Sequence, residues 1–220
     1  MTDQKIENSD AVSVRWIFFL IFVILFALTA LLVVTNKTVA IDTPIQSWIF
    51  SLRSDALTAF TKAVTHGGDT NVVAVICLVL IILPKRLQIG MPVALIAGTG
   101  AAIQQMLKAV IGRPRPDAVN WLVAEDGFSF PSGHTNASLI LYLAIAIIFG
   151  RWLILHGHPA AAKVLRIVLP VFAVLVALSR PYLGVHYPTD IFGGWMLGGA
   201  LLILLYSLYE RFWPTKWRIA

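Results

Sequence analysis

Residues 16–35 read WIFFLIFVILFALTALLVVT, a run of twenty positions without a charged side chain. A helix of this length spans about 30 Å, which matches the hydrocarbon core of a bilayer. The run is longer than the apolar core of a typical secretory signal peptide, and Thr35-Asn36-Lys37 does not resemble a small-residue cleavage site. We therefore expect residues 16–35 to form a transmembrane helix that the protein retains.

The rest of the chain continues this pattern. Of its 220 residues, 58% are hydrophobic and 13% are charged, whereas a soluble domain carries about 25% charged residues. Together with the first run, five further apolar runs indicate an all-α protein with six transmembrane helices in one bundle. Its length suits a single domain over residues 1–220. The further runs are Thr70–Leu83, Gln88–Leu107, Thr135–Phe149, Val164–Leu178 and Ile191–Tyr209.

The loop between the first two spans carries helix signals of its own. Thr43-Pro44 is typical of an N-cap followed by proline at the first helical position, and Ser54-Asp55 indicates a second start. Apolar residues follow each start at helical spacing. We expect two short amphipathic helices in the membrane interface, with Trp48 as an anchor.

The basic residues indicate a membrane orientation. The net charge is +6, but the basic residues form no stripe or run, so we expect no nucleic-acid partner. They flank the apolar runs instead, with ten on the side of the two termini and seven on the other. Because Lys and Arg concentrate on the cytoplasmic side, we expect cytoplasmic termini and outward-facing third and fifth loops. The small size suits a bacterial-type plasma membrane.

Three polar clusters interrupt the apolar chain. They are residues 108–116, 131–134 and 179–190, and all lie at ends of spans on the same expected side. Charged groups at membrane depth are unfavourable, so they usually mark a functional site. The three clusters therefore predict one site at the outer face.

The residue types in these clusters suit a phosphoryl group. Lys108, Arg115 and Arg180 offer positive charge, and arginine adds a planar fork that matches phosphate oxygens. Ser132 and Gly133 lie at an expected helix start, where unpaired N–H groups and the helix dipole favour an anion. These basic groups supply the charge that a metal ion would supply, so we expect no metal and no cofactor.

Two histidines and one aspartate suit nucleophilic catalysis. His186 and Asp190 are four residues apart, so the carboxylate is within reach of the imidazole and orients it for attack on phosphorus. His134 then serves as general acid and base. The role of Arg113 stays open: it is either a phosphate contact or an anchor in the membrane interface.

These motifs resemble a known family signature. Lys-x6-Arg-Pro, Pro-Ser-Gly-His and Ser-Arg-x5-His-x3-Asp are similar to the three motifs of the type 2 phosphatidic acid phosphatase superfamily, which also contains the vanadium haloperoxidases. The resemblance implies a helical bundle with its site near the outer interface, open sideways to lipid. It also implies that the second histidine of the motifs, His186, is the nucleophile and the first, His134, the acid.

The motifs describe the phosphate and not the rest of the substrate. Phosphatidylglycerophosphate, phosphatidic acid and undecaprenyl pyrophosphate all remain candidate lipid substrates, and the oligomeric state remains open. The alternatives are a lipid phosphotransferase, a haloperoxidase and a non-catalytic lipid or anion transporter. Outside the motifs, we expect His66 in a solvated turn, and Glu125 and Asp126 as solvated loop charges.

Overall fold

The computed structural model describes the backbone of residues 2–214 and the side chains of residues 14–214, and within these limits its regular elements are all helices. Lys5, Lys216 and Arg218, which entered the charge count, have side chains outside the described residues. The eight α-helices are α1 (Thr2–Val34), α2 (Val39–Ser51), α3 (Asp55–Thr65), α4 (Thr70–Ile82), α5 (Met91–Ile111), α6 (Gly133–Leu155), α7 (Pro159–Tyr182) and α8 (Pro188–Phe212).

Five stretches among the described residues are long and apolar enough to cross a membrane. They are Val14–Val34, Arg86–Ile111, Gly133–Leu155, Pro159–Tyr182 and Pro188–Phe212. A sixth span arises if α3 and α4, which meet at a bend of 51°, are taken together. On its own, α4 is only about 20 Å long, which is too short for the bilayer core. The expectation of an all-α membrane protein is confirmed.

The start expected for the first interfacial helix is wrong. Helix α2 begins at Val39, and Pro44 lies inside it rather than at its first position. The first turn forms early because the N–H groups of Ile41 and Asp42 both donate to the Thr38 carbonyl, and the Asp42 side chain is held in the protein interior. The second start is confirmed, since the Ser54 hydroxyl accepts from the Leu57 N–H.

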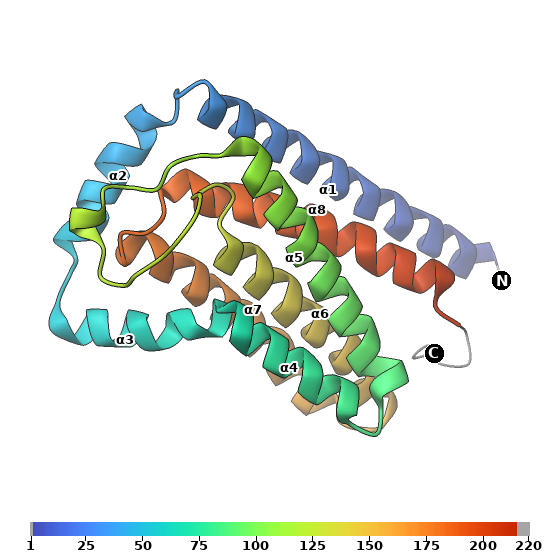
Figure 1. Cartoon of the computed structure of the whole chain (residues 1–220). Coiled ribbons are helices and arrows are strands. Elements are labelled where there is room, and N and C mark those ends of the chain that lie inside the picture. Colours follow the sequence, from blue (N-terminus) through green and yellow to red (C-terminus); the bar gives the residue numbers. More distant parts are fainter. Residues whose placement is uncertain (1, 215–220) are drawn as a thin grey trace.

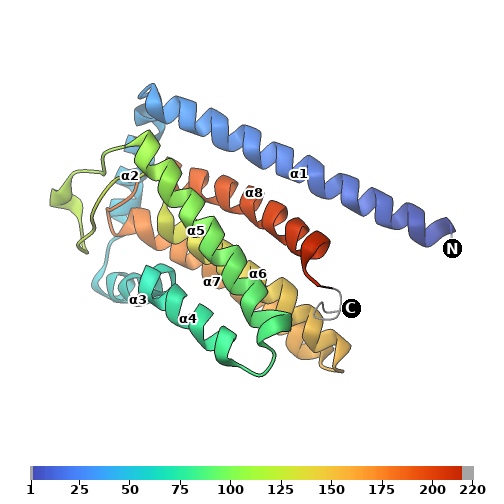
Figure 2. The same cartoon turned by 45° about the vertical axis from the view of Figure 1, so that its right-hand side comes forward.

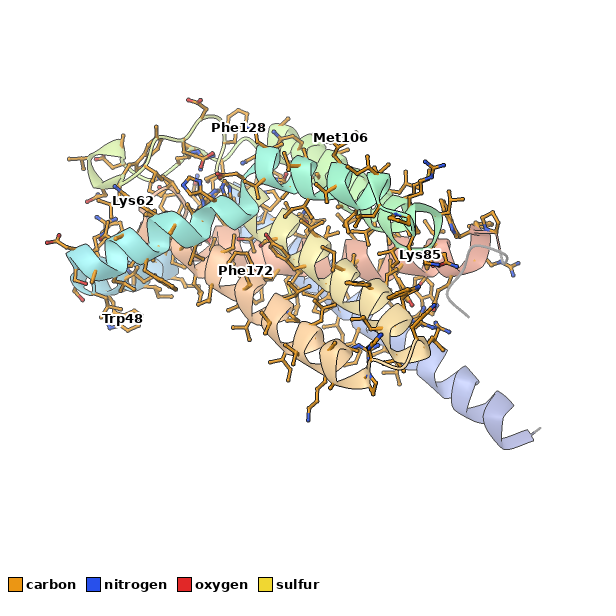
Figure 3. The ribbon with its side chains drawn as sticks, turned by 90° about the horizontal axis from the view of Figure 1, so that it is seen from below. Trp48, Lys62, Lys85, Met106, Phe128 and Phe172 are labelled. Carbon is orange, nitrogen blue, oxygen red and sulfur yellow. The ribbon has the colours of Figure 1, made fainter. Side chains whose placement is uncertain are left out.

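The helices place the polar loops at one end of the bundle (Figure 1). Helix α6 packs against α5, α7 and α8, while α1 lies along α8 on the outside (Figure 2). The end of α5, the start of α6 and the turn between α7 and α8 meet near α2 and α3, and α1 begins at the opposite end. Figure 3 shows Trp48 and Lys62 at the α2–α3 end and Lys85 at the other.

Two glycines on α8 allow a close approach of this helix to the segment around the start of α6. A Cβ at Gly193 would lie 2.3 Å from Cε2 of the fully buried Phe130, and one at Gly194 would lie 2.9 Å from Cβ of Thr135. Such distances are below any real carbon contact, so α8 reaches the start of α6 only because side chains are missing there. The second and third motifs are thereby brought into contact.

Candidate active site

The structure brings the three polar clusters together. The Ser132 N–H donates to the Asp190 carbonyl at 3.1 Å, which joins the second cluster to the third. The Arg115 Nη1 donates to the Val185 carbonyl at 2.9 Å, which joins the first cluster to the third. One site is therefore assembled from the end of α5, the start of α6 and the turn before α8.

His186 is enclosed by the protein and paired with a carboxylate. Its side chain is 1% exposed, and its Nδ1 lies 3.2 Å from Asp190 Oδ2. The same carboxylate oxygen accepts from the Tyr187 N–H at 2.8 Å, so the start of α8 holds it in place. With the proton on Nδ1, the lone pair is on Nε2, and Arg115 Nη1 donates to this atom at 3.1 Å.

The environment keeps the His186 ring neutral. Burial, followed by the positive charges of Arg180 and Arg115, lowers the pKa of His186 well below its usual value. A neutral imidazole has the lone pair that attack on phosphorus requires. Burial also lowers the pKa of Arg115, to about 10, which leaves its guanidinium charged at neutral pH.

Arg113 is engaged by carboxylates on both sides. Its Nη1 lies 2.6 Å from Asp190 Oδ1, and its Nη2 lies 2.7 Å from Asp42 Oδ2. Its guanidinium also lies 4.0 Å from the centre of the Tyr187 ring. Burial opposes its charge, but Asp190 and Asp42 more than offset this and raise the pKa of Arg113. This geometry favours a positioning role over either a phosphate contact or an interface anchor.

Asp42 was not found by sequence reasoning. It is 1% exposed on α2, and it accepts from the N–H and the hydroxyl of Thr189 as well as from Arg113. The signal was an acidic residue on a helix that exposes Ile45, Trp48 and Leu52. Because the apolar face of this helix points outward, the carboxylate of Asp42 points into the protein. A buried carboxylate is unfavourable unless it has a polar or charged partner.

Arg180 and Arg115 share one carboxylate. Arg180 is 2% exposed, its Nη1 donates to Thr65 Oγ1 at 2.7 Å, and its Nη2 pairs with Glu125. The other oxygen of Glu125 lies 3.5 Å from Arg115 Nη2. The interpretation of Glu125 as a solvated loop charge is therefore wrong, because its side chain is only 23% exposed and bridges both arginines. Among the described residues, the buried Arg180 Nε has no hydrogen-bond partner.

The remaining candidate phosphate-binding groups lie at the end of α5 and at the start of α6. Lys108 lies half-buried in the last turn of α5, where Arg115, Arg180 and Asp190 are its electrostatic neighbours. Ser132 is the N-cap of α6, and its hydroxyl oxygen accepts from the N–H and the hydroxyl of Thr135. Gly133 is the first residue of that helix. Ser132 is thus occupied in capping the helix, while its own hydroxyl hydrogen remains available.

His134 has a carboxylate partner of its own. Its Nε2 lies 2.8 Å from Asp69 Oδ1, and Asp69 Oδ2 lies 2.6 Å from Nδ1 of the exposed His66. Sequence reasoning placed this segment in a solvated turn and missed Asp69. The available signal was the pair Gly67-Gly68, a break between two helical patterns that brings a carboxylate close to the site.

Comparisons with known proteins agree with this geometry. The family model of the PAP2 superfamily matches residues 89–214, which contain all three motifs. Phosphatidylglycerophosphatase B of Bacillus subtilis is 33% identical over 197 residues, which cover 88% of this chain and 93% of that protein. Decaprenylphosphoryl-5-phosphoribose phosphatase of Mycobacterium tuberculosis is 34% identical over 154 residues, which cover 65% of this chain and 75% of that protein.

A solved structure shows the same fold. The crystal structure of a transmembrane PAP2-type phosphatidylglycerolphosphate phosphatase from Bacillus subtilis matches with a TM-score of 0.72 at 32% identity, covering 90% of this chain and 96% of that one. A bundle of membrane-spanning helices with a basic, histidine-containing site at one end defines a multi-pass lipid phosphatase. The chain belongs to the PAP2 superfamily.

Proposed function

We propose that the protein removes the terminal phosphate of a membrane lipid through a phosphohistidine formed on Nε2 of His186. The observation that carries this proposal is the His186–Asp190 pair, in which Nε2 of His186 lies beside Arg115 and among further positive charges. A transporter needs the charge but has no need for an imidazole oriented by a buried carboxylate.

The reaction has two steps. In the first, the Nε2 lone pair of His186 forms a bond to phosphorus, the ester P–O bond breaks, and the leaving oxygen takes a proton from His134. In the second, the oxygen of a water attacks phosphorus and gives a proton to His134. The P–N bond breaks, and its electron pair returns to Nε2. Asp190 holds His186 in the required tautomer throughout.

The phosphate oxygens take the place of the Glu125 carboxylate. Lys108, Arg115 and Arg180 supply fixed positive charge, and the first turn of α6 at Gly133 supplies N–H groups. Because Arg115 and Arg180 are both paired with Glu125 in the structure, substrate entry requires this carboxylate to move. The Arg180 Nε then also gains an acceptor.

Phosphatidylglycerophosphate is the first substrate to test. The relative that matches most of this chain is named a phosphatidylglycerophosphatase, and a second relative acts, by its name, on a phosphorylated polyprenyl lipid. Phosphatidic acid and undecaprenyl pyrophosphate present the same kind of lipid-anchored phosphate. Transfer of the phosphoryl group to a second lipid is the alternative outcome of the same intermediate.

The site is proposed to face outward. It lies at the end of the bundle opposite the start of α1 (Figure 1), and the Lys and Arg distribution favours a cytoplasmic location for that start.

The test is phosphate release by the full chain purified in detergent, with each of the three lipids and excess chelator. The expected result is release that His186→Ala abolishes, together with an acid-labile, alkali-stable phosphoryl label on the wild-type protein. Release that persists in His186→Ala would reject the nucleophile. Label transfer to added lipid without phosphate release would favour the phosphotransferase.

A further inference from the structure

A chain of three side chains runs from the candidate general acid toward solvent. His134 is 15% exposed, Asp69 is 36% exposed and His66 is 69% exposed. The two oxygens of Asp69 are divided between the rings, since Oδ1 lies 2.8 Å from His134 Nε2 and Oδ2 lies 2.6 Å from His66 Nδ1. The mechanism above uses His134 but assigns no role to the other two residues.

The backbone that carries Asp69 is built for a close approach. Residues 66–68 form a 3-10 turn between α3 and α4, and Gly67 and Gly68 are both buried. A Cβ at Gly68 would lie 2.9 Å from His134 Cδ2, and one at Gly67 would lie 2.5 Å from Phe172 Cε1. The Tyr142 hydroxyl donates to the Gly67 carbonyl at 2.8 Å. Only a glycine pair brings Asp69 so near the ring of His134.

The charge around His134 explains why a carboxylate is needed there. To donate a proton, the ring must first carry two, and burial opposes this positive charge, as do Lys108 and Arg115. Asp69 is an anion in direct contact with the ring, so it favours the protonated form. It also fixes the proton on Nε2, which leaves Nδ1 as the nitrogen that exchanges a proton with the substrate. Besides these groups, His186 is an electrostatic neighbour of His134.

We infer that Asp69 is the positioning residue of His134, and that His66 connects this pair to solvent. In the first step, the Nδ1 proton of His134 goes to the leaving oxygen, while the Asp69 carboxylate keeps the Nε2 proton in place. In the second step, Nδ1 takes a proton from the attacking water, and Asp69 stabilises the imidazolium that forms. The proton bound in the second step replaces the one lost in the first, so the cycle balances.

This inference rests on the proposed function, and the two are tested separately. His134→Ala serves as the reference, because loss of acid–base catalysis lowers kcat by about 10²–10⁴-fold and leaves a measurable rate. Asp69→Asn keeps the shape of the side chain but removes its charge. We expect it to lower kcat on the lipid phosphate about 100-fold. The matched control is Asp55→Asn, an exposed carboxylate on the preceding helix, which should leave kcat unchanged.

The double variant Asp69→Asn/His134→Ala separates positioning from a structural role. If Asp69 acts through His134, the double variant is no slower than His134→Ala alone. Additive losses, or Asp69→Asn within threefold of wild type, would overturn the inference while leaving the phosphatase proposal intact.

A surface variant covers the case in which Asp69→Asn does not fold. His66→Phe removes one hydrogen bond at an exposed position, so we expect kcat to fall about threefold to tenfold in wild type. The same change should have no effect in the His134→Ala background. An equal effect in both backgrounds would refute the connection. Activity that survives His186→Ala would instead reject the proposed function itself.

Discussion

Glu125 pairs with the two arginines that bind phosphate in the proposed mechanism. Removing its negative charge should therefore increase the affinity of the site for phosphate. Its carboxylate pairs with Arg180 and lies 3.5 Å from Arg115, with 23% of the side chain exposed. Substrate phosphate can use these arginines only after the carboxylate has left. Glu125→Gln should therefore strengthen the binding of any phosphate-like anion.

The size of the effect follows from the contacts. A hydrogen bond to a charged group contributes about 1.5–3 kcal/mol, and we take the lower end because Glu125 is partly exposed and its contact with Arg115 is long. The amide oxygen of glutamine is a neutral acceptor and keeps about half of this contribution. The net gain is about 0.75 kcal/mol, which corresponds to about threefold to fourfold tighter binding.

The assay is competitive inhibition of lipid phosphate hydrolysis by inorganic phosphate, at fixed pH and ionic strength. Glu125→Gln should lower the inhibition constant about threefold to fourfold, and it should also lower KM. Asp126→Asn is the matched control, because it removes an exposed neighbouring loop charge while keeping the backbone carbonyl that accepts from Arg115. An unchanged inhibition constant in Glu125→Gln would contradict this prediction, and a higher one would place Glu125 among the groups that favour substrate binding.

Three further predictions concern the nucleophile and the packing. Because burial, Arg180 and Arg115 lower the pKa of His186, the acid limb of kcat/KM due to this group should lie well below pH 6.5, and Arg115→Gln should move it to higher pH; a pH–rate profile with no such shift would contradict this. Arg113→Lys cannot bridge Asp42 and Asp190, so kcat should fall about 100-fold with little change in KM, as steady-state kinetics would show. Gly193→Ala should reduce stability in detergent by about 1–3 kcal/mol through its clash with Phe130, whereas Gly98→Ala, with no atom within 4 Å, should be neutral in thermal unfolding.

The sequence alone determined the class of fold and the basic outline of the site. Long uncharged runs predict membrane helices, because a backbone in lipid must satisfy its hydrogen bonds within its own segment. This requirement is local, so it can be recognised in the sequence. The motif residues were predictable for a similar reason, since His186 and Asp190 lie four residues apart and meet at the start of one helix. The predicted helix ends were less accurate. Helix α2 begins before Pro44, because the buried contacts of Asp42 outweigh the preference of proline for the first helical position.

The tertiary structure decided which carboxylate partners each cation and each histidine. Asp42 lies 71 residues from Arg113, Asp69 lies 65 from His134, and Glu125 lies 55 from Arg180. None of these pairs follows from periodicity or spacing, because each depends on how separate helices pack at one end of the bundle. Acidic side chains usually remain solvated, and only their placement beside a fixed positive charge or a histidine makes these three residues partners of the site.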